Sequence, residues 1–208
     1  FDVFKDLTPV TMHADSMMCL AVHPSLQINS VPELVAYAKA NPGKLGWATA
    51  GVGSTGHILC EVFKREAGID ILHVPYRGSA DALNDLLANN VQMMNESSSL
   101  PHVDAGKLVM LNINHPKRSP KYPNLPTLTE LGLPGADAPI WFSIWAPAGT
   151  PKEIREKINA KMAEIAKDPD MHARLSEAGY VPESSTMDEL VAAMNQGRKE
   201  HQELIKAA

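Results

Sequence analysis

The sequence lacks any long hydrophobic run, and no apolar stretch approaches the roughly 20 residues that a membrane-spanning helix requires. Cysteine is scarce as well, with two in 208 residues. Cys19 and Cys60 each lie in an apolar segment. We therefore expect both side chains to be small buried hydrophobes rather than the two halves of a disulfide.

Positive charge is also in short supply. Lys and Arg number 19 against 24 Asp and Glu, the net charge is −5, and the basic residues are scattered. This balance argues against a nucleic-acid partner, because phosphate binding needs clustered Lys and Arg. The spacings typical of metal sites are missing too, since His57, His73, His102 and His115 are isolated in sequence, so we expect no metal.

What the chain does contain is an alternation of short apolar runs with amphipathic helical segments, which predicts an α/β fold with parallel strands. Strands are expected at residues 17–23, 45–50, 71–74, 91–94, 107–113 and 140–146. Helices are expected at 31–40, 57–67, 79–89, 150–167, 169–178 and 187–206. Ser30 with Glu33, and Thr150 with Glu153, have the spacing of a capping box. A change from strand-rich to helix-rich composition predicts a domain boundary near residue 137.

The segment from residue 48 to 57 is a strand end, a Gly-rich turn and a helix start. A helix N-terminus leaves its first N–H groups unpaired and carries about half a positive charge, so it attracts anions. The glycines of this segment let a ligand approach the backbone, while Thr49, Ser54 and Thr55 add hydroxyl donors. The segment therefore suits a carboxylate or a phosphate. The alternative is a plain strand-to-helix turn capped by Ser or Thr.

Two enzyme-like interpretations of the same loop are weaker. Gly51, Gly53 and Gly56 match G-x-G-x-x-G, but the acidic residue expected about 20 positions on is missing from the next strand end. Ser54 lacks the first glycine of a G-x-S-x-G nucleophile turn, and His57, three positions on, is poorly spaced to act as its base. We therefore expect neither catalysis nor a bound cofactor.

The most specific pattern is an ordered set of short blocks: ANPGKL (40–45), GVGSTGH (51–57), HVPYRG (73–78), LPT (125–127), ELGLPG (130–135) and APAGTP (146–151). In this order, and over nearly the whole chain, they resemble the substrate-binding proteins of tripartite tricarboxylate transporters, the Bug-type receptors. The resemblance implies a two-lobed periplasmic-binding-protein architecture of type II, the Venus flytrap. The opening part of the family pattern has no match, so the first lobe is expected to be incomplete. Residues 1–14 would be a crossover segment, 15–136 the second ligand-binding lobe, and 137–208 the C-terminal part of the first.

The resemblance also implies which residues hold the ligand. They are Thr49, Ala50, Gly53, Ser54, Thr55, Gly56, His57, Gly78 and Asn95. The sequence departs from the family pattern at residues 93–99, where Asn95 or Glu96 stands in for the usual Asp of a longer segment. A Glu at this place would repel an anion unless it met an amino group or a hydroxyl of the ligand.

We therefore expect a periplasmic solute-binding protein that captures a small organic carboxylate, whether a di- or tricarboxylate, an aromatic acid or an amino acid. It would act as a monomer and pass its ligand to the permease subunits of the transporter. Phe1 is not an initiator Met, so a signal peptide is expected outside this chain. The alternatives are a two-lobed ligand-sensing effector domain and, less favoured, a hydrolase that uses Ser54.

Overall fold

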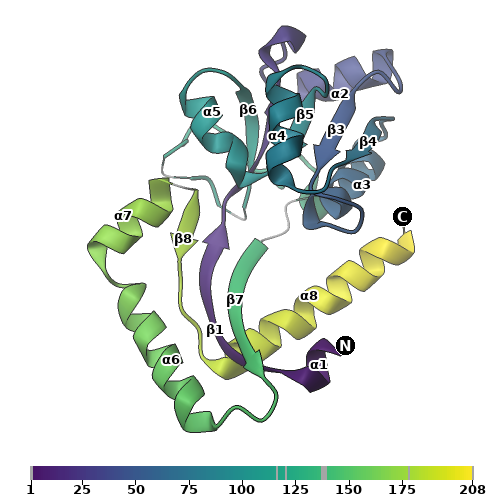
Figure 1. Ribbon diagram of the computed structural model, residues 1–208. Helices are drawn as coiled ribbons and strands as arrows, with labels where there is room; N and C mark the ends of the chain where they lie inside the picture. The colour runs from purple at the N-terminus through teal and green to yellow at the C-terminus, as the bar shows by residue number, and fades with distance from the viewer. Residues whose placement is uncertain (1, 116, 120, 137–139, 178, 208) are drawn as a thin grey trace. The chain divides into compact units, whose positions relative to one another are not determined.

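The computed structural model describes residues 2–115, 117–119, 121–136, 140–177 and 179–207. The chain forms two compact units (Figure 1). Phe1–Ser16 and Ile140–Ala207 make unit 1, and Met17–Pro139 make unit 2. Unit 1 has a three-stranded sheet of order β7-β1-β8, and unit 2 has a five-stranded sheet of order β4-β3-β5-β2-β6. The assignment of residues 1–14, 15–136 and 137–208 to family lobes stays a prediction.

The sheet of unit 2 is mixed, so the expectation of parallel strands was right for only part of it. β3 (Gly46–Thr49) runs parallel to β4 (Leu72–Pro75) and to β5 (Met93–Asn95). β2 (Met18–Val22) lies between β5 and β6 (Val109–Asn114) and is antiparallel to both. A buried apolar run reads the same in either direction, and the sequence pattern therefore carried no information on the direction of β2.

Three helices of unit 2 lie where the sequence predicted them, with ends that differ by a few residues, and the sequence did not predict the fourth, which is short. They are α2 (Val31–Ala40), α3 (Thr55–Ala67), α4 (Ser79–Leu87) and the short α5 (Leu100–Asp104), with 3-10 turns η1 (Pro24–Leu26), η2 (Ser97–Ser99) and η3 (Pro134–Ala136). The predicted cap of α2 is confirmed, because the Ser30 hydroxyl accepts from the Glu33 amide at 3.3 Å. The Glu33 carboxylate reaches back to the amide of Asn29 at 2.8 Å, one residue further than a capping box requires.

Opposite faces of this sheet bury α3 and α4. Trp47 and Phe63 of α3 are both fully buried, with ring centroids 5.4 Å apart and an edge-on geometry. Since neighbouring strand residues point to opposite faces, Ala48 turns away from Trp47 and joins the apolar cluster that includes Leu86 of α4. Truncation of a buried aromatic such as Trp47 costs about 3–5 kcal/mol, so its packing on Phe63 holds α3 firmly against the sheet.

Both cysteines are buried and unpaired, as the sequence predicted. Burial raises the pKa of the Cys19 thiol and of the Cys60 thiol to about 12, so neither is a thiolate at neutral pH. We expect a thiol-reactive disulfide reagent to leave both unlabelled in the native protein at pH 8 and to label both in guanidinium chloride. Rapid labelling of the native protein would contradict the burial of these side chains.

Unit 1 joins the beginning of the chain to its last third. The central strand β1 (Leu7–Ser16) pairs antiparallel with β7 (Ile140–Pro147) and with β8 (Tyr180–Pro182), and the sequence predicted neither β1 nor β8. The helices are α1 (Val3–Asp6), α6 (Lys152–Ile165), α7 (Pro169–Glu177) and α8 (Met187–Ala207). The predicted capping box at Thr150 is wrong, because its hydroxyl donates to the Pro147 carbonyl at 2.7 Å and α6 has no side-chain cap.

A buried polar network holds the C-terminal part of unit 1 to β1. The Thr11 hydroxyl accepts from the Ser185 amide at 3.2 Å, and the Ser185 hydroxyl accepts from the Met12 amide at 2.9 Å. The Asn159 side chain donates to the carbonyls of Val10 and Ser185, both at 2.7 Å. These bonds satisfy backbone groups that the short strand β8 leaves unpaired along β1.

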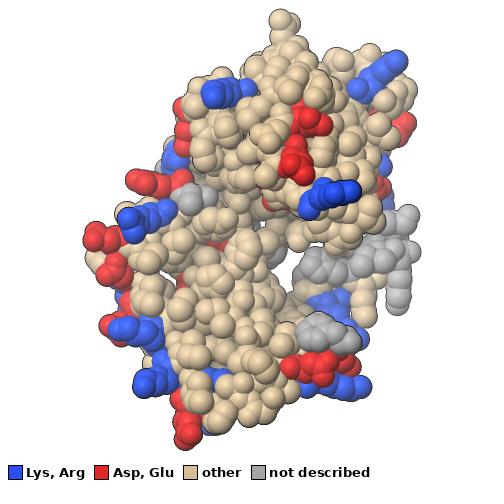
Figure 2. All heavy atoms as spheres, viewed as in Figure 1, with Lys and Arg blue, Asp and Glu red and all other residues tan. Residues whose placement is uncertain are grey.

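Charge is mixed over the surface. On the face shown in Figure 2, Lys and Arg side chains are interspersed with Asp and Glu, as a net charge of −5 would suggest. The visible face therefore presents no continuous basic surface of the kind that binds a nucleic-acid backbone.

Within the described residues, no helix has both the length and the apolar character to cross a membrane.

Candidate functional site

Three parallel strands of unit 2 end at one edge of the sheet. β4, β3 and β5 finish there with Pro75, Thr49 and Asn95, and the chain leaves β3 and β4 directly into the turns that start α3 and α4. In open α/β sheets ligands bind outside the carboxyl ends of the strands, where loops and helix N-termini gather. This carboxyl edge is the candidate site.

The start of α3 offers unpaired backbone donors at this edge. Ser54 is the cap, and its hydroxyl accepts from the His57 amide at 3.3 Å. The amides of Thr55 and Gly56 have no intrahelical acceptor, and none of the contacts recorded for the described residues supplies one. Two N–H groups and the positive end of a helix of 13 residues are therefore available to an anion.

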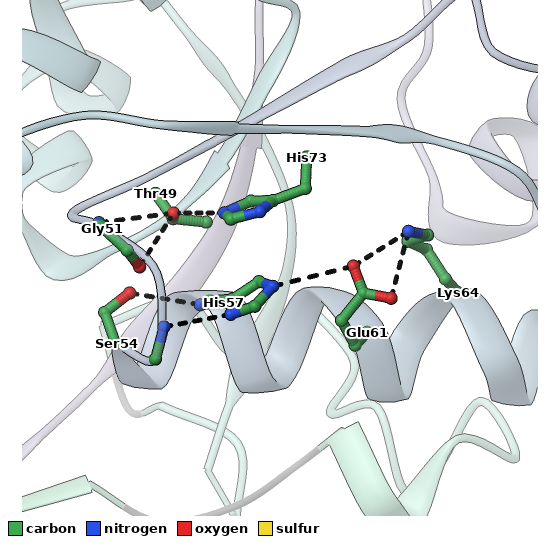
Figure 3. A network of polar contacts seen from close by, with 8 residues as sticks. Thr49, Gly51, Ser54, His57, Glu61, Lys64 and His73 are labelled. Carbon is green, nitrogen blue, oxygen red and sulfur yellow. Dashed lines mark hydrogen bonds and ion pairs between the residues drawn. The ribbon is translucent and has the colours of Figure 1, made fainter. Parts of the chain in front are cut away.

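Two stacked histidines lie beside this turn (Figure 3). The rings of His57 and His73 are 3.9 Å apart between centroids and nearly parallel, at 18°. The His73 Nε2 and the Thr49 hydroxyl are 2.7 Å apart, and the His57 Nδ1 accepts from the Gly53 amide at 3.1 Å. Because Nδ1 of His57 is an acceptor, the ring proton is on Nε2, which lies 4.0 Å from the Glu61 carboxylate.

His73 adds no fixed positive charge to the edge. Burial, and then the neighbouring His57, lowers the pKa of His73 below its ordinary value, so that His73 is neutral at physiological pH. Its function in this geometry is to hold the Thr49 hydroxyl. Backbone amides and helix dipoles are the groups at this edge that would attract an anion.

The start of α4 completes the edge from the other face of the sheet. Gly78 precedes the helix and provides no side-chain cap, so the first amides of α4 are free of a capping acceptor. The Ser79 side chain lies near the carboxylate of Glu96, the residue that follows β5, and lowers its pKa in part against the rise that burial causes. The same carboxylate lies 3.4 Å from the position that a Cβ on Gly56 would take. Glu96 therefore bridges the N-termini of α3 and α4.

The structure brings most of the predicted ligand-binding residues to one place. A Cβ on Gly56 would lie within 4 Å of both Thr49 and Asn95, and Gly53, Ser54, Thr55 and His57 belong to the same turn. Ala50 follows Thr49 at the end of β3, and Gly78 lies at the start of α4. The structure contains no ligand contact for any of them, and their binding role stays a prediction.

Sequence reasoning missed His73 and Ser79 as members of the edge. The signal that could have found His73 is its place in β4, because adjacent parallel strands end side by side, and β3 pairs with β4 through Trp47 and His73. Ser79 follows Gly78 in the next helix start. The described residues contain no group of three or more His, Cys, Asp and Glu placed to hold a metal ion.

The contacts of Ser54 do not form a nucleophile–base pair. Its hydroxyl meets the backbone amide of His57 and not the imidazole, and the imidazole Nδ1 is already bonded to Gly53. A serine nucleophile needs a base within hydrogen-bond reach of its hydroxyl. Ser54 is therefore a helix cap in this structure, and the capping interpretation of the loop is confirmed for this residue.

Comparison with known proteins decides the family. The model of the tripartite tricarboxylate transporter family receptor, TctC, matches residues 1–208. The chain belongs to this receptor family. The curated protein BugT of Bordetella pertussis is 34% identical over 191 residues, which are 91% of this chain and 59% of BugT. The chain spans 53% and 59% of the length of the first curated relatives it matches.

Solved receptors of this family have the same fold. The structure of R. palustris Rpa4515 with adipate matches this chain with a TM-score of 0.94 and 33% sequence identity. The matched region covers 99% of this chain and 70% of the Rpa4515 chain. The structure of the periplasmic binding protein BugD matches with a TM-score of 0.91 and 28% sequence identity. The matched region covers 100% of this chain and 71% of the BugD chain. The α/β, two-lobed periplasmic-binding-protein fold predicted for this receptor is thereby confirmed.

Proposed function

We propose that this chain is the ligand-holding part of a periplasmic receptor that captures a small organic carboxylate. The observation that carries the proposal is the pair of unpaired amides, Thr55 and Gly56, at the start of α3. A carboxylate placed there gains two hydrogen bonds and the favourable end of the helix dipole. The adipate bound to Rpa4515 supports a carboxylate as the ligand.

Family membership supports the partner in this proposal. The receptor hands its ligand to the membrane permease subunits of a tripartite tricarboxylate transporter, and it acts in the periplasm as a monomer without a cofactor. Binding is noncovalent, through backbone amides and the hydroxyls of Thr49 and Thr55. The net charge of −5 is no obstacle, because the local amides, and not the global charge, set the potential at the edge.

Thermal-shift screening of the full-length gene product against mono-, di- and tricarboxylates, aromatic acids and amino acids tests this function. A ligand at a 100-fold excess over its Kd stabilises by about 2.7 kcal/mol, which is a rise of roughly 5–10 °C in Tm for a chain of this size. Changing Ser54 and Thr55 together to Ala should reduce the shift, because it removes the Thr55 hydroxyl and the cap that orders the first turn of α3, while the backbone amides remain. The Ser54 substitution alone costs about 1 kcal/mol of helix capping, so the double variant should remain folded.

The control is a substitution of the same kind away from the edge. Ser30→Ala removes the cap of α2, and should lower Tm by a similar amount without changing the ligand-induced shift. A folded full-length protein that shows no shift with any acid of the panel would sink the carboxylate proposal. An equal shift in the double variant would remove the hydroxyls of Ser54 and Thr55 from the binding site.

A further inference from the structure

Glu96 is an acidic residue at the carboxyl edge of the sheet, where the free helix amides favour an anion. It follows β5, lies near the Ser79 side chain at the start of α4, and is 3.4 Å from where a Cβ of Gly56 would be. Glu96 lies near the N-termini of α3 and α4, and no ion pair among the described residues includes it. A half-buried carboxylate without a cation is costly, and it also repels a second carboxylate in the same place.

Asn95 adds a second acceptor that lacks a partner. Its side chain is 1% exposed, and its Oδ1 has no hydrogen-bond partner. Met94 packs on the α4 face of the sheet with Ala48, so Asn95 turns to the other face, where Thr49 lies beneath the start of α3. An amide oxygen this deeply buried usually has a donor, and its lack of one indicates that the donor comes from outside the chain.

The two ends of the edge are therefore suited to different chemical groups of a ligand. The amides of Thr55 and Gly56 are donors that suit a carboxylate. The oxygens of Asn95 and Glu96 are acceptors that suit a donor, and Glu96 suits a cation. A molecule that carries a carboxylate and an ammonium group close together satisfies both, whereas a plain dicarboxylate brings a second negative charge toward Glu96.

We propose that this edge selects amino acids over the matching plain carboxylic acids, with Glu96 accepting the ligand's ammonium group. The inference rests on the proposed function, since it assigns the substrate class of the same site. Burial raises the pKa of Glu96 to about 6, so the group is ionised at pH 7.5 and mostly protonated at pH 5. Selection by Glu96 should accordingly weaken in acid.

Isothermal titration calorimetry of the full-length gene product with two matched pairs tests the inference. The pairs are aspartate with succinate and glutamate with glutarate, each differing by one amino group. At pH 7.5 we expect the amino member of at least one pair to bind roughly tenfold or more tighter, as one good charged contact would give. The preference should fall to within about threefold in Glu96→Gln, and in the native protein at pH 5.

Glu130→Gln is the matched control. It removes one negative charge from the same unit at a half-exposed ion pair with Arg118, away from the edge, and should keep the full preference. Ser79→Ala keeps the carboxylate but removes the hydroxyl beside it, so an intermediate preference is expected. Thermal unfolding of each variant establishes that it is folded.

Two results would overturn the selection by Glu96. One is that the native protein binds both members of each pair equally well, or favours the plain acid. The other is that Glu96→Gln keeps the preference for the amino member. Failure of the broader function looks different, because a folded protein would then bind no acid of either kind, and that outcome overturns both proposals together.

Discussion

Replacing Glu96 with Gln is expected to stabilise the ligand-free protein at pH 7.5 by about 1–2 kcal/mol. Burial raises the pKa of Glu96 from 4.5 to about 6, so the ionised form is disfavoured in the folded state. The positive ends of α3 and α4 oppose part of this penalty, which is why the expected gain lies below the full value of the shift. Gln keeps an oxygen that can accept from Ser79. Urea unfolding at several pH values measures the difference.

The sign of this effect depends on pH. A carboxyl whose folded pKa is raised contributes stability that is fully present below its unfolded value of 4.5 and is lost as pH rises through about 6. The gain of Glu96→Gln should therefore be largest above pH 6 and vanish below pH 4.5. Other titrating groups are shared by both proteins and cancel in the difference. A variant that is less stable than the native protein at pH 7.5 would contradict this account.

Gly56→Ala is expected to weaken ligand binding by roughly 100-fold, equivalent to about 2–3 kcal/mol, and to leave the fold intact. A Cβ at Gly56 would lie 3.4 Å from Glu96, 3.7 Å from the Asn95 carbonyl and 3.8 Å from Thr49, which are ordinary contacts. It would also occupy the space through which a ligand approaches the Gly56 amide. Alanine favours a helix over glycine by up to about 1 kcal/mol, so Tm should not fall.

The control for this substitution is Gly197→Ala in α8. A Cβ there meets nothing within 4 Å, so the change adds the same helix preference in unit 1 without touching the edge. Calorimetry with the best ligand of the panel, together with thermal unfolding, separates the two effects. Unchanged affinity in Gly56→Ala would remove the Gly56 amide from the binding site.

These two substitutions test opposite properties of one edge. Glu96→Gln should raise the free energy of unfolding and reduce the preference for amino acids. Gly56→Ala should leave the stability unchanged or higher and reduce the affinity for the ligand. Functional sites commonly retain groups that cost stability, because the same groups serve the ligand. A change that improves both stability and binding would indicate that the residue concerned has a structural role only.

Local patterns in the sequence predicted the elements of unit 2 well. Ser30, with a proline in the first helical turn and Glu33 beyond it, marks the start of α2, and the structure has that helix over the expected residues. The Gly-rich turn before α3 and the cap at Ser54 were equally local, because glycine freedom and hydroxyl capping depend on neighbouring residues. Gly53 has a φ of 78°, which few other residues adopt readily.

Features that depend on distant partners were not predictable in the same way. β1 contains Pro9, alternates irregularly and has two register shifts against β7, so it lacks the clean period of a strand. The pairing of His57 with His73, and of Glu96 with Ser79, follows from the order of strands in the sheet, which no local pattern encodes. The antiparallel direction of β2 was missed for the same reason.

The sequence did contain the essential fact about Glu96, namely that Asn95 or Glu96 stands in for the Asp of a longer segment in the family pattern. What it lacked was the three-dimensional setting. Only the convergence of two helix starts on this carboxylate, with Asn95 unpaired beside it, turns an unusual residue into a selectivity hypothesis. Fold resemblance gives the class of protein, and the site gives its ligand.

Unit 1 is discontinuous in the chain, and this has a consequence for the order in which the protein assembles. Unit 2 is one uninterrupted stretch, so it can fold from contacts within itself. β1 is synthesised before all of unit 2, but both of its partners, β7 and β8, come after it. During synthesis β1 therefore has two open hydrogen-bonding edges until the last third of the chain emerges, which makes it the strand most in need of protection from aggregation.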